Sequence, residues 1–201
     1  MQHPRFSPFS DTLELDAALD TLRKATDGAD DGELFLERRR SEALVLDDGR
    51  IKNASYDASE GFGLRAVKGD VTGYAHSSEL SESALRRAAE TARLAVGDGG
   101  GVMADGPRAT NTILYSDTDP LTETTFKVKI DTLREIDAYV RDMDPRVVQV
   151  SATLSGSLQE VFILRPDGQL VQDTRPMSRL NISVILEENG RRESGGHGGG
   201  G

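Results

Sequence analysis

The fold is decided by the stretch Val148-Gln149-Val150-Ser151-Ala152-Thr153-Leu154, in which apolar and polar residues alternate. Successive side chains of a β-strand point to opposite faces, so this period of two predicts a strand with one buried face. The alternation recurs over residues 180–186. Asp48-Gly49 and Asp167-Gly168 are hairpin-turn signals between strand-like runs, and Asn189-Gly190 is another after the last run. These features predict antiparallel strand pairs.

Three stretches have the spacing of amphipathic helices. In the first, residues 15–25 carry the apolar positions, and Asp11 with Glu14 suits a helix start. The second begins after a capping Ser81, and the third runs from near Thr122 to Pro145. The order helix, strands, helix, helix, strands predicts an α+β fold, with a mainly antiparallel sheet packed with about three helices.

An internal repeat is one reading of this order. A shift of 119 residues places Asp48-Gly49 on Asp167-Gly168 and lays residues 62–67 on residues 181–186. Strand-turn-strand units are common, so a match of element order also arises without duplication. The residues leave both readings open.

Composition narrows the class of protein. The 201 residues, 36% hydrophobic and 29% charged, suit one large domain or two small ones in a soluble protein. A net charge of −10 argues against a nucleic-acid partner, because binding to nucleic-acid phosphates requires a positively charged protein surface. The chain has no cysteine, no apolar leader segment and no stretch of membrane-spanning length. A cytoplasmic location without a membrane partner is therefore expected.

Metal-ligating residues are sparse. The three histidines, His3, His76 and His197, lie far apart in the sequence, and no His-Glu-x-x-His pattern occurs. Zinc ligands usually occur at least partly paired on one element, so no zinc site is expected from these three. Residues 27–33 are acidic, but their spacing does not match a calcium loop, and a solvated loop is expected there.

Catalytic patterns are also missing. Ser155-Gly156-Ser157 does not form a nucleophile elbow and is interpreted as a hairpin connection. Glu187-Glu188 precedes a turn and is expected to face solvent. Gly61-Phe62-Gly63 opens no helix, as a dinucleotide-binding loop would, so its glycines indicate a bulge or a close backbone approach. We therefore assign no catalytic and no metal-binding residue in this chain.

The chain ends on a glycine-rich segment. Six of the residues 195–201 are glycine, with His197 between them. Glycine loses the most backbone entropy on ordering, and such stretches often join two folded parts. The sequence thus predicts a domain over residues 1–194 and a mobile start of a linker over residues 195–201.

Three blocks of sequence, in order, carry a family resemblance. The first block comprises residues 48–53, 60–67 and 69–76, and the second comprises residues 150–161 and 173–176. The third is residues 187–193, running into the glycine tract. Together they resemble the amino-terminal domain of the TldD/PmbA family from about Asp11 onward. The Gly-Leu-Arg-Ala-Val run at residues 63–67 and the glycine tract make the match closer to the TldD subunit than to its PmbA (TldE) partner.

The resemblance implies a zinc metallopeptidase that cleaves small or unfolded peptides as a heterodimer with a TldE/PmbA-like subunit. TldD-like proteins carry a His-Glu-x-x-x-His motif and a further cysteine ligand after the glycine tract. None of these ligands is present here. The resemblance therefore makes this chain a non-catalytic part that contributes to the subunit interface and the substrate enclosure, and that is inactive alone. A stand-alone peptide-binding or scaffolding module is the alternative.

Overall fold

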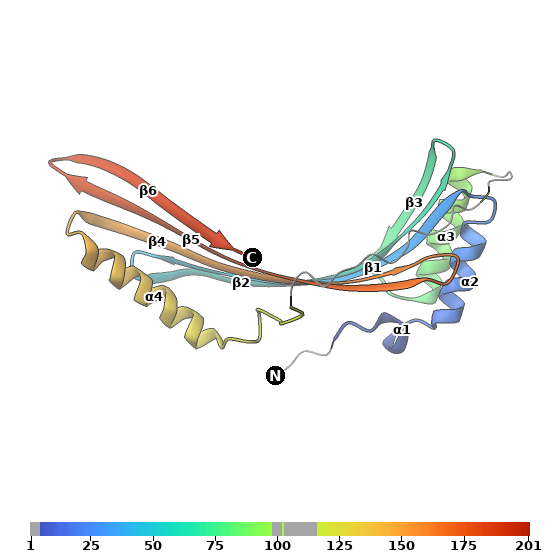
Figure 1. Ribbon diagram of the computed structural model, residues 1–201, viewed down its shortest axis with the longest axis horizontal. Helices are drawn as coiled ribbons and strands as arrows, with labels where there is room; N and C mark the ends of the chain where they lie inside the picture. Colours follow the sequence, from blue (N-terminus) through green and yellow to red (C-terminus); the bar gives the residue numbers. More distant parts are fainter. Residues whose placement is uncertain (1–4, 98–101, 103–115) are drawn as a thin grey trace.

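The computed structural model describes residues 5–97, 102 and 116–201. These residues form four helices and six strands (Figure 1). In chain order the elements are α1 (Pro8–Asp11), α2 (Leu15–Ala25), β1 (Asp31–Asp47), β2 (Arg50–Lys68), β3 (Val71–Ser77), α3 (Glu82–Val96), α4 (Phe126–Met143), β4 (Val147–Leu164), β5 (Leu170–Glu188) and β6 (Arg191–Gly200). The predicted α+β class is confirmed.

One antiparallel sheet in the order β3-β2-β1-β4-β5-β6 organises the molecule. The long strands β1 and β4 pair at its centre, where Ser41 lies opposite Ser157. Each is followed outward by two further strands, so the two halves of the sheet have the same topology. This arrangement fits the shift of 119 residues noted in the sequence, although the duplication itself stays a prediction.

The helices all lie on one side of the curved sheet, the convex side, and leave the concave side uncovered in the described part of the chain (Figure 1). At one end, α2 and α3 pack on β1, β2 and β3 around a cluster that includes Leu22, Leu34, Leu64 and Leu85. At the other end, α4 covers a smaller cluster around Leu133. Burial of these apolar side chains is the main favourable contribution to the stability of each end.

The helix boundaries test the predicted starts. Ser81 caps α3 as predicted, and its Oγ accepts a 3.2 Å hydrogen bond from the Ala84 amide. The predicted start of the first helix at Asp11 is wrong, because Asp11 ends the separate short helix α1, and α2 begins at Leu15. The third helix begins after a Thr125 cap, slightly later than predicted.

The predicted turns are present. Asp48 and Gly49 connect β1 to β2 with φ values of 51° and 74°, and Asn189-Gly190 connects β5 to β6 with similar positive values. Two successive positive φ values suit the twist of a tight hairpin. The strand at residues 148–154 is also confirmed, but Val148 is 42% exposed because a β-bulge removes it from the register with β5.

The glycine tract differs from the expected linker conformation. Arg191–Gly200 forms the edge strand β6, which pairs with Arg179–Glu188 of β5. A Cβ atom at Gly198 would lie 2.2 Å from the Asn181 side-chain oxygen, and one at Gly200 would lie 2.3 Å from the Ser178 carbonyl oxygen. Absence of side chains lets this strand approach β5 closely. A link from Gly201 to a further domain stays a prediction.

Candidate functional site: a charged cluster and an uncovered sheet edge

The structure separates the histidines that it describes. His76 lies on β3 and His197 on β6, which are the two opposite edges of the sheet, and His3 lies outside the described residues. Across residues 5–97 and 116–201, no three His, Asp or Glu side chains are grouped as a metal ion would require.

The acidic stretch 27–33 leads into the sheet and is only partly a solvated loop. Asp31 begins β1 and accepts hydrogen bonds from Arg165 Nη2 at 2.6 Å and Arg65 Nη2 at 3.0 Å. Partial burial alone would raise the pKa of Asp31, but the hydrogen bond and charge of Arg165, the Gly32 amide and the charge of Arg65 together hold the pKa below its usual value. The carboxylate oxygens that a metal cation would need are therefore engaged by arginine side chains.

Ser155-Gly156-Ser157 is not the hairpin connection that the sequence suggested. The three residues lie within β4, where Gly156 pairs with Glu42 of β1 and Ser178 of β5. A Cβ atom at Gly156 would lie 3.1 Å from the Leu121 side chain. The glycine therefore marks a close packing contact.

Glu187 and Glu188 do face solvent in part and form ion pairs with Arg192 at 2.7 Å and Arg146 at 3.3 Å, respectively. Their carboxylates are thus engaged at the surface rather than paired with each other for acid–base chemistry.

Gly61 and Gly63 lie in β2, and the predicted close approach is confirmed. A Cβ atom at Gly61 would lie 2.6 Å from the Ser77 carbonyl oxygen, and one at Gly63 would lie 2.6 Å from the Tyr74 hydroxyl. The Tyr74 side chain thus lies across the glycine on the concave face.

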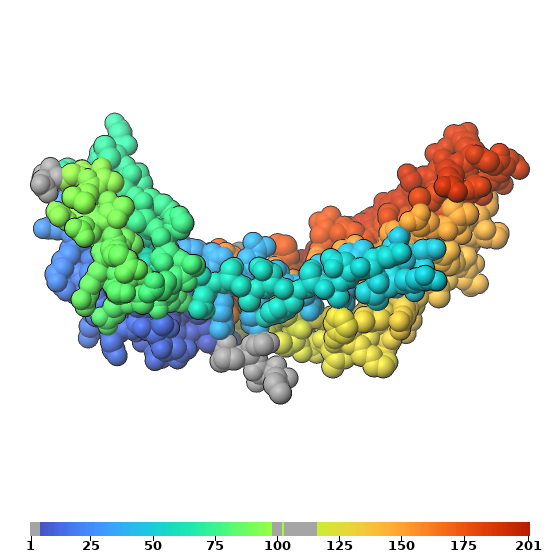
Figure 2. Space-filling model, turned by 180° about the vertical axis from the view of Figure 1, so that it is seen from behind, coloured from blue at the N-terminus to red at the C-terminus, as the bar shows by residue number. Residues whose placement is uncertain are grey.

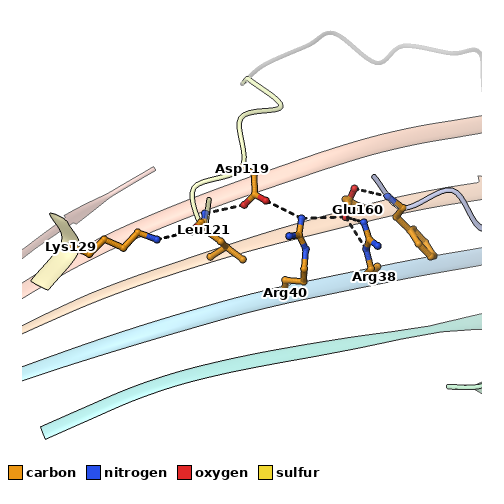
Figure 3. Close-up of polar contacts among 7 residues, drawn as sticks. Arg38, Arg40, Asp119, Leu121, Lys129 and Glu160 are labelled. Atoms are coloured by element: carbon orange, nitrogen blue, oxygen red, sulfur yellow. Dashed lines mark hydrogen bonds and ion pairs between the residues drawn. The ribbon is translucent and has the colours of Figure 1, made fainter. Parts of the chain in front are cut away.

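A cluster of charged side chains, here called the waist cluster, lies on the convex face between the two apolar clusters. Figure 3 shows its contacts around Arg40 and Glu160. No motif in the sequence indicated this cluster. Its members come from β1, β4, α4 and the segment before α4, and they are Arg38, Arg40, Glu42, Asp119, Lys129 and Glu160.

Glu160 is the central acceptor of the waist cluster. Its Oε2 accepts hydrogen bonds from Arg38 Nε at 3.1 Å and Nη2 at 2.9 Å, and its Oε1 accepts the Phe6 amide at 2.9 Å. Arg40 Nη2 lies 3.0 Å from Asp119 Oδ2 and 3.8 Å from Glu160. The side chain of Glu160 is only 5% exposed, so these partners compensate for a large loss of hydration.

Lys129 of α4 joins the other side of the waist cluster. Its Nζ donates to the Leu121 carbonyl at 2.9 Å and pairs with Glu42 of β1. Arg40 Nε and Nη1 are buried without a hydrogen-bond partner in the described part of the chain. Three cationic and three anionic groups balance in charge. The cluster therefore serves to hold the segment before α4 against the sheet.

The concave face and one edge of the sheet are the remaining candidate surfaces. β3 pairs with β2 only from Phe62 to Lys68. Residues 52–60 of β2 are exposed, and their outer edge is uncovered in Figure 2. Where β3 ends there is a shallow pocket of about 290 Å³, lined by residues that include Phe35, Glu37, Glu60, Tyr74 and His76.

Comparison with known proteins gives the family. Residues 32–96 match the model of PmbA/TldA metallopeptidase domain 1, and residues 119–201 match the model of the PmbA/TldA metallopeptidase central domain. The chain belongs to the PmbA/TldD family. The resemblance seen in the sequence is thereby confirmed.

Curated relatives in this family are similar over most of the chain. It is 38% identical over 177 residues to a metalloprotease TldD homolog of Haemophilus influenzae, covering 86% of this chain and 36% of that protein. It is 34% identical over 172 residues to a metalloprotease TldD homolog of Buchnera aphidicola, covering 85% of this chain and 36% of that protein. The chain thus spans about a third of the length of these relatives.

Solved structures share the fold of this PmbA/TldD chain at low identity. A Thermotoga maritima protein, described as a candidate modulator of a DNA gyrase, superposes with a TM-score of 0.77 at 16% identity, over 93% of this chain and 42% of that one. TldE from Thermococcus kodakarensis superposes with a TM-score of 0.66 at 14% identity, over 92% of this chain and 42% of that one. Among the described helices, none has the length and apolar character needed to cross a lipid bilayer.

Proposed function

We propose that this chain is the amino-terminal, non-catalytic part of a TldD-like zinc metallopeptidase that cleaves small or unfolded peptides. One observation supports this above all. The relatives are named metalloproteases, and the chain corresponds to a third of their length, in which the described residues lack a metal-binding group. Activation of water at neutral pH requires a metal held by protein ligands with an open position, so the metal belongs to the remainder of the protein.

The role of this part is to bind a TldE/PmbA-like partner subunit and to enclose the substrate. Among the described residues, no helix lies on the concave face and no strand covers the edge of β2 at residues 52–60. Both features support this role, because sheet edges bind extended peptides through main-chain hydrogen bonds with little sequence preference. A cytoplasmic location stays part of the proposal.

The test compares the 201-residue chain plus excess zinc with the full-length protein, each mixed with the partner subunit. We expect only the full-length protein to cleave an unfolded peptide. Equal cleavage by the two samples contradicts the assignment of roles. A natural reading frame that stops near Gly201 instead supports a stand-alone peptide-binding or scaffolding module.

A further inference from the structure

The uncovered edge of β2 lies directly in line with β3. The last pair of the β2–β3 ladder is Phe62 with Ser77, after which the chain turns away toward α3. A strand added to β2 from residue 60 toward residue 53 therefore continues the course of β3, and its amino end lies beside Ser77 and Ser78. An unpaired edge offers a row of free amide and carbonyl groups to such a strand.

The pocket lies at this junction and has the chemistry of a cation site. Glu37 lines it on the concave side, and its carboxylate forms no ion pair or side-chain hydrogen bond among the residues described. Glu37 is half-buried, which weakens the screening of its charge by water. The exposed aromatic ring of Tyr74 forms another wall, and such rings attract ammonium and guanidinium groups.

Two features of the edge argue against a second copy of the chain as its occupant. A β-bulge near Lys52 interrupts the regular register between Val45 and Leu46, and bulges and lysines are devices that protect strand edges from edge-to-edge pairing. The regular part that remains, residues 53–60, matches a short extended segment.

We propose that the edge of β2 at residues 53–60 binds an extended peptide antiparallel to β2, with a lysine or arginine side chain near the peptide's amino end in the pocket beside Glu37 and Tyr74. This inference rests on the proposed function, which it deepens by naming the substrate feature that is recognised. The edge supplies affinity without regard to sequence, and the pocket sets the register of the peptide.

The test measures binding of acetylated ten-residue peptides of serine and threonine to the 201-residue chain by fluorescence anisotropy. The peptides carry lysine, norleucine or glutamate at the first position, or lysine at the last. We expect the peptide with the first-position lysine to bind about fivefold or more tightly than the others. Hydrogen exchange should slow at residues 53–60 when this peptide binds.

Variants of the pocket sharpen the test. Glu37→Gln and Tyr74→Ala should each remove the preference for lysine, whereas Glu135→Gln and Tyr139→Ala, which make the same changes on the exposed surface of α4, should retain it. Circular dichroism checks that each variant is folded.

Several results overturn the inference. They are equal binding of all four peptides, absence of binding, protection from exchange only outside residues 53–60, and a dimer in sedimentation that the peptide does not disperse. Because this assay reads binding by the isolated chain, its failure is separable from failure of the cleavage assay, which reads catalysis by the full-length protein with its partner.

Discussion

The carboxylate of Glu160 fixes the amino-terminal segment to the sheet, because its Oε1 accepts the backbone amide of Phe6 at 2.9 Å. Its other oxygen binds Arg38, whose guanidinium carbon lies 5.3 Å from the centroid of the Phe6 ring. Phe6 in turn contacts Phe162 edge to face, with the ring centroids 5.8 Å apart. One buried carboxylate therefore connects the waist cluster to the larger apolar cluster.

Glu160→Gln should lower the free energy of unfolding by about 3–5 kcal/mol, because it leaves buried arginine charge without its anion. Urea denaturation measures this loss. The control Glu188→Gln removes an exposed partner of Arg146 and should cost under about 1 kcal/mol. Similar losses in the two variants would show that burial of the waist cluster is energetically unimportant.

Gly73→Ala should destabilise the chain by about 2 kcal/mol or more, because the added methyl group overpacks the contact between β3 and α3 and forces the backbone to shift. The added Cβ would lie 2.2 Å from the Ala92 carbonyl oxygen of α3, which packs on β3. Gly195→Ala is the control, since a Cβ there meets nothing within 4 Å in a strand of the same sheet. Thermal unfolding of both variants decides the matter, and equal melting temperatures would contradict the close packing of α3.

Asp31→Asn should destabilise the chain in a pH-dependent way. The pKa of Asp31 is lowered in the folded state, so its ionised form adds stability above its unfolded pKa of about 3.9. That contribution is lost as the pH falls through the lowered folded pKa. The melting temperatures of wild type and variant should differ at pH 7, and the difference should shrink as the pH falls below the unfolded pKa of Asp31.

Asp142→Asn removes a carboxylate from the exposed surface of α4 and serves as the control at pH 7, where it should leave the melting temperature unchanged. A gap between wild type and Asp31→Asn that stays constant with pH would contradict the ionic role of Asp31.

Amide hydrogen exchange should distinguish a paired β6 from a mobile linker. Because Arg191–Gly200 pairs with β5, we expect its inward-facing amides to exchange more slowly than those of a free peptide with the same sequence. Mass spectrometry of the pepsin-digested chain measures the difference. Exchange at the free-peptide rate would instead support the mobile linker that the composition of residues 195–201 predicts.

Local patterns predicted the elements better than they predicted the contacts between them. The cap at Ser81 and the turn at Asp48-Gly49 depend on neighbouring residues, and both are present. The glycine tract misled the prediction because its pairing depends on β5, which no local propensity reports.

The waist cluster left a partial signal in the sequence. Along β1 the convex-facing positions are Leu34 and Leu36, followed by Arg38 and Arg40. Charged residues at core positions indicate buried ion pairs. The partner Glu160 is 122 residues away from Arg38 in the chain, so only the three-dimensional pairing of β1 with β4 could identify it.

The long central strands also determine how the molecule can be divided. The larger apolar cluster takes Phe162 and Leu164 from the segment that matches the family's central domain, and the smaller one takes Leu44 and Leu46 from the segment that matches its first domain. We therefore expect that neither segment completes a core when it is expressed alone. Co-expression of the two as separate polypeptides should instead reassemble the sheet through β1 and β4. The boundary between the family's two sequence models would then be a site for splitting the chain, and not a boundary between independently folding units.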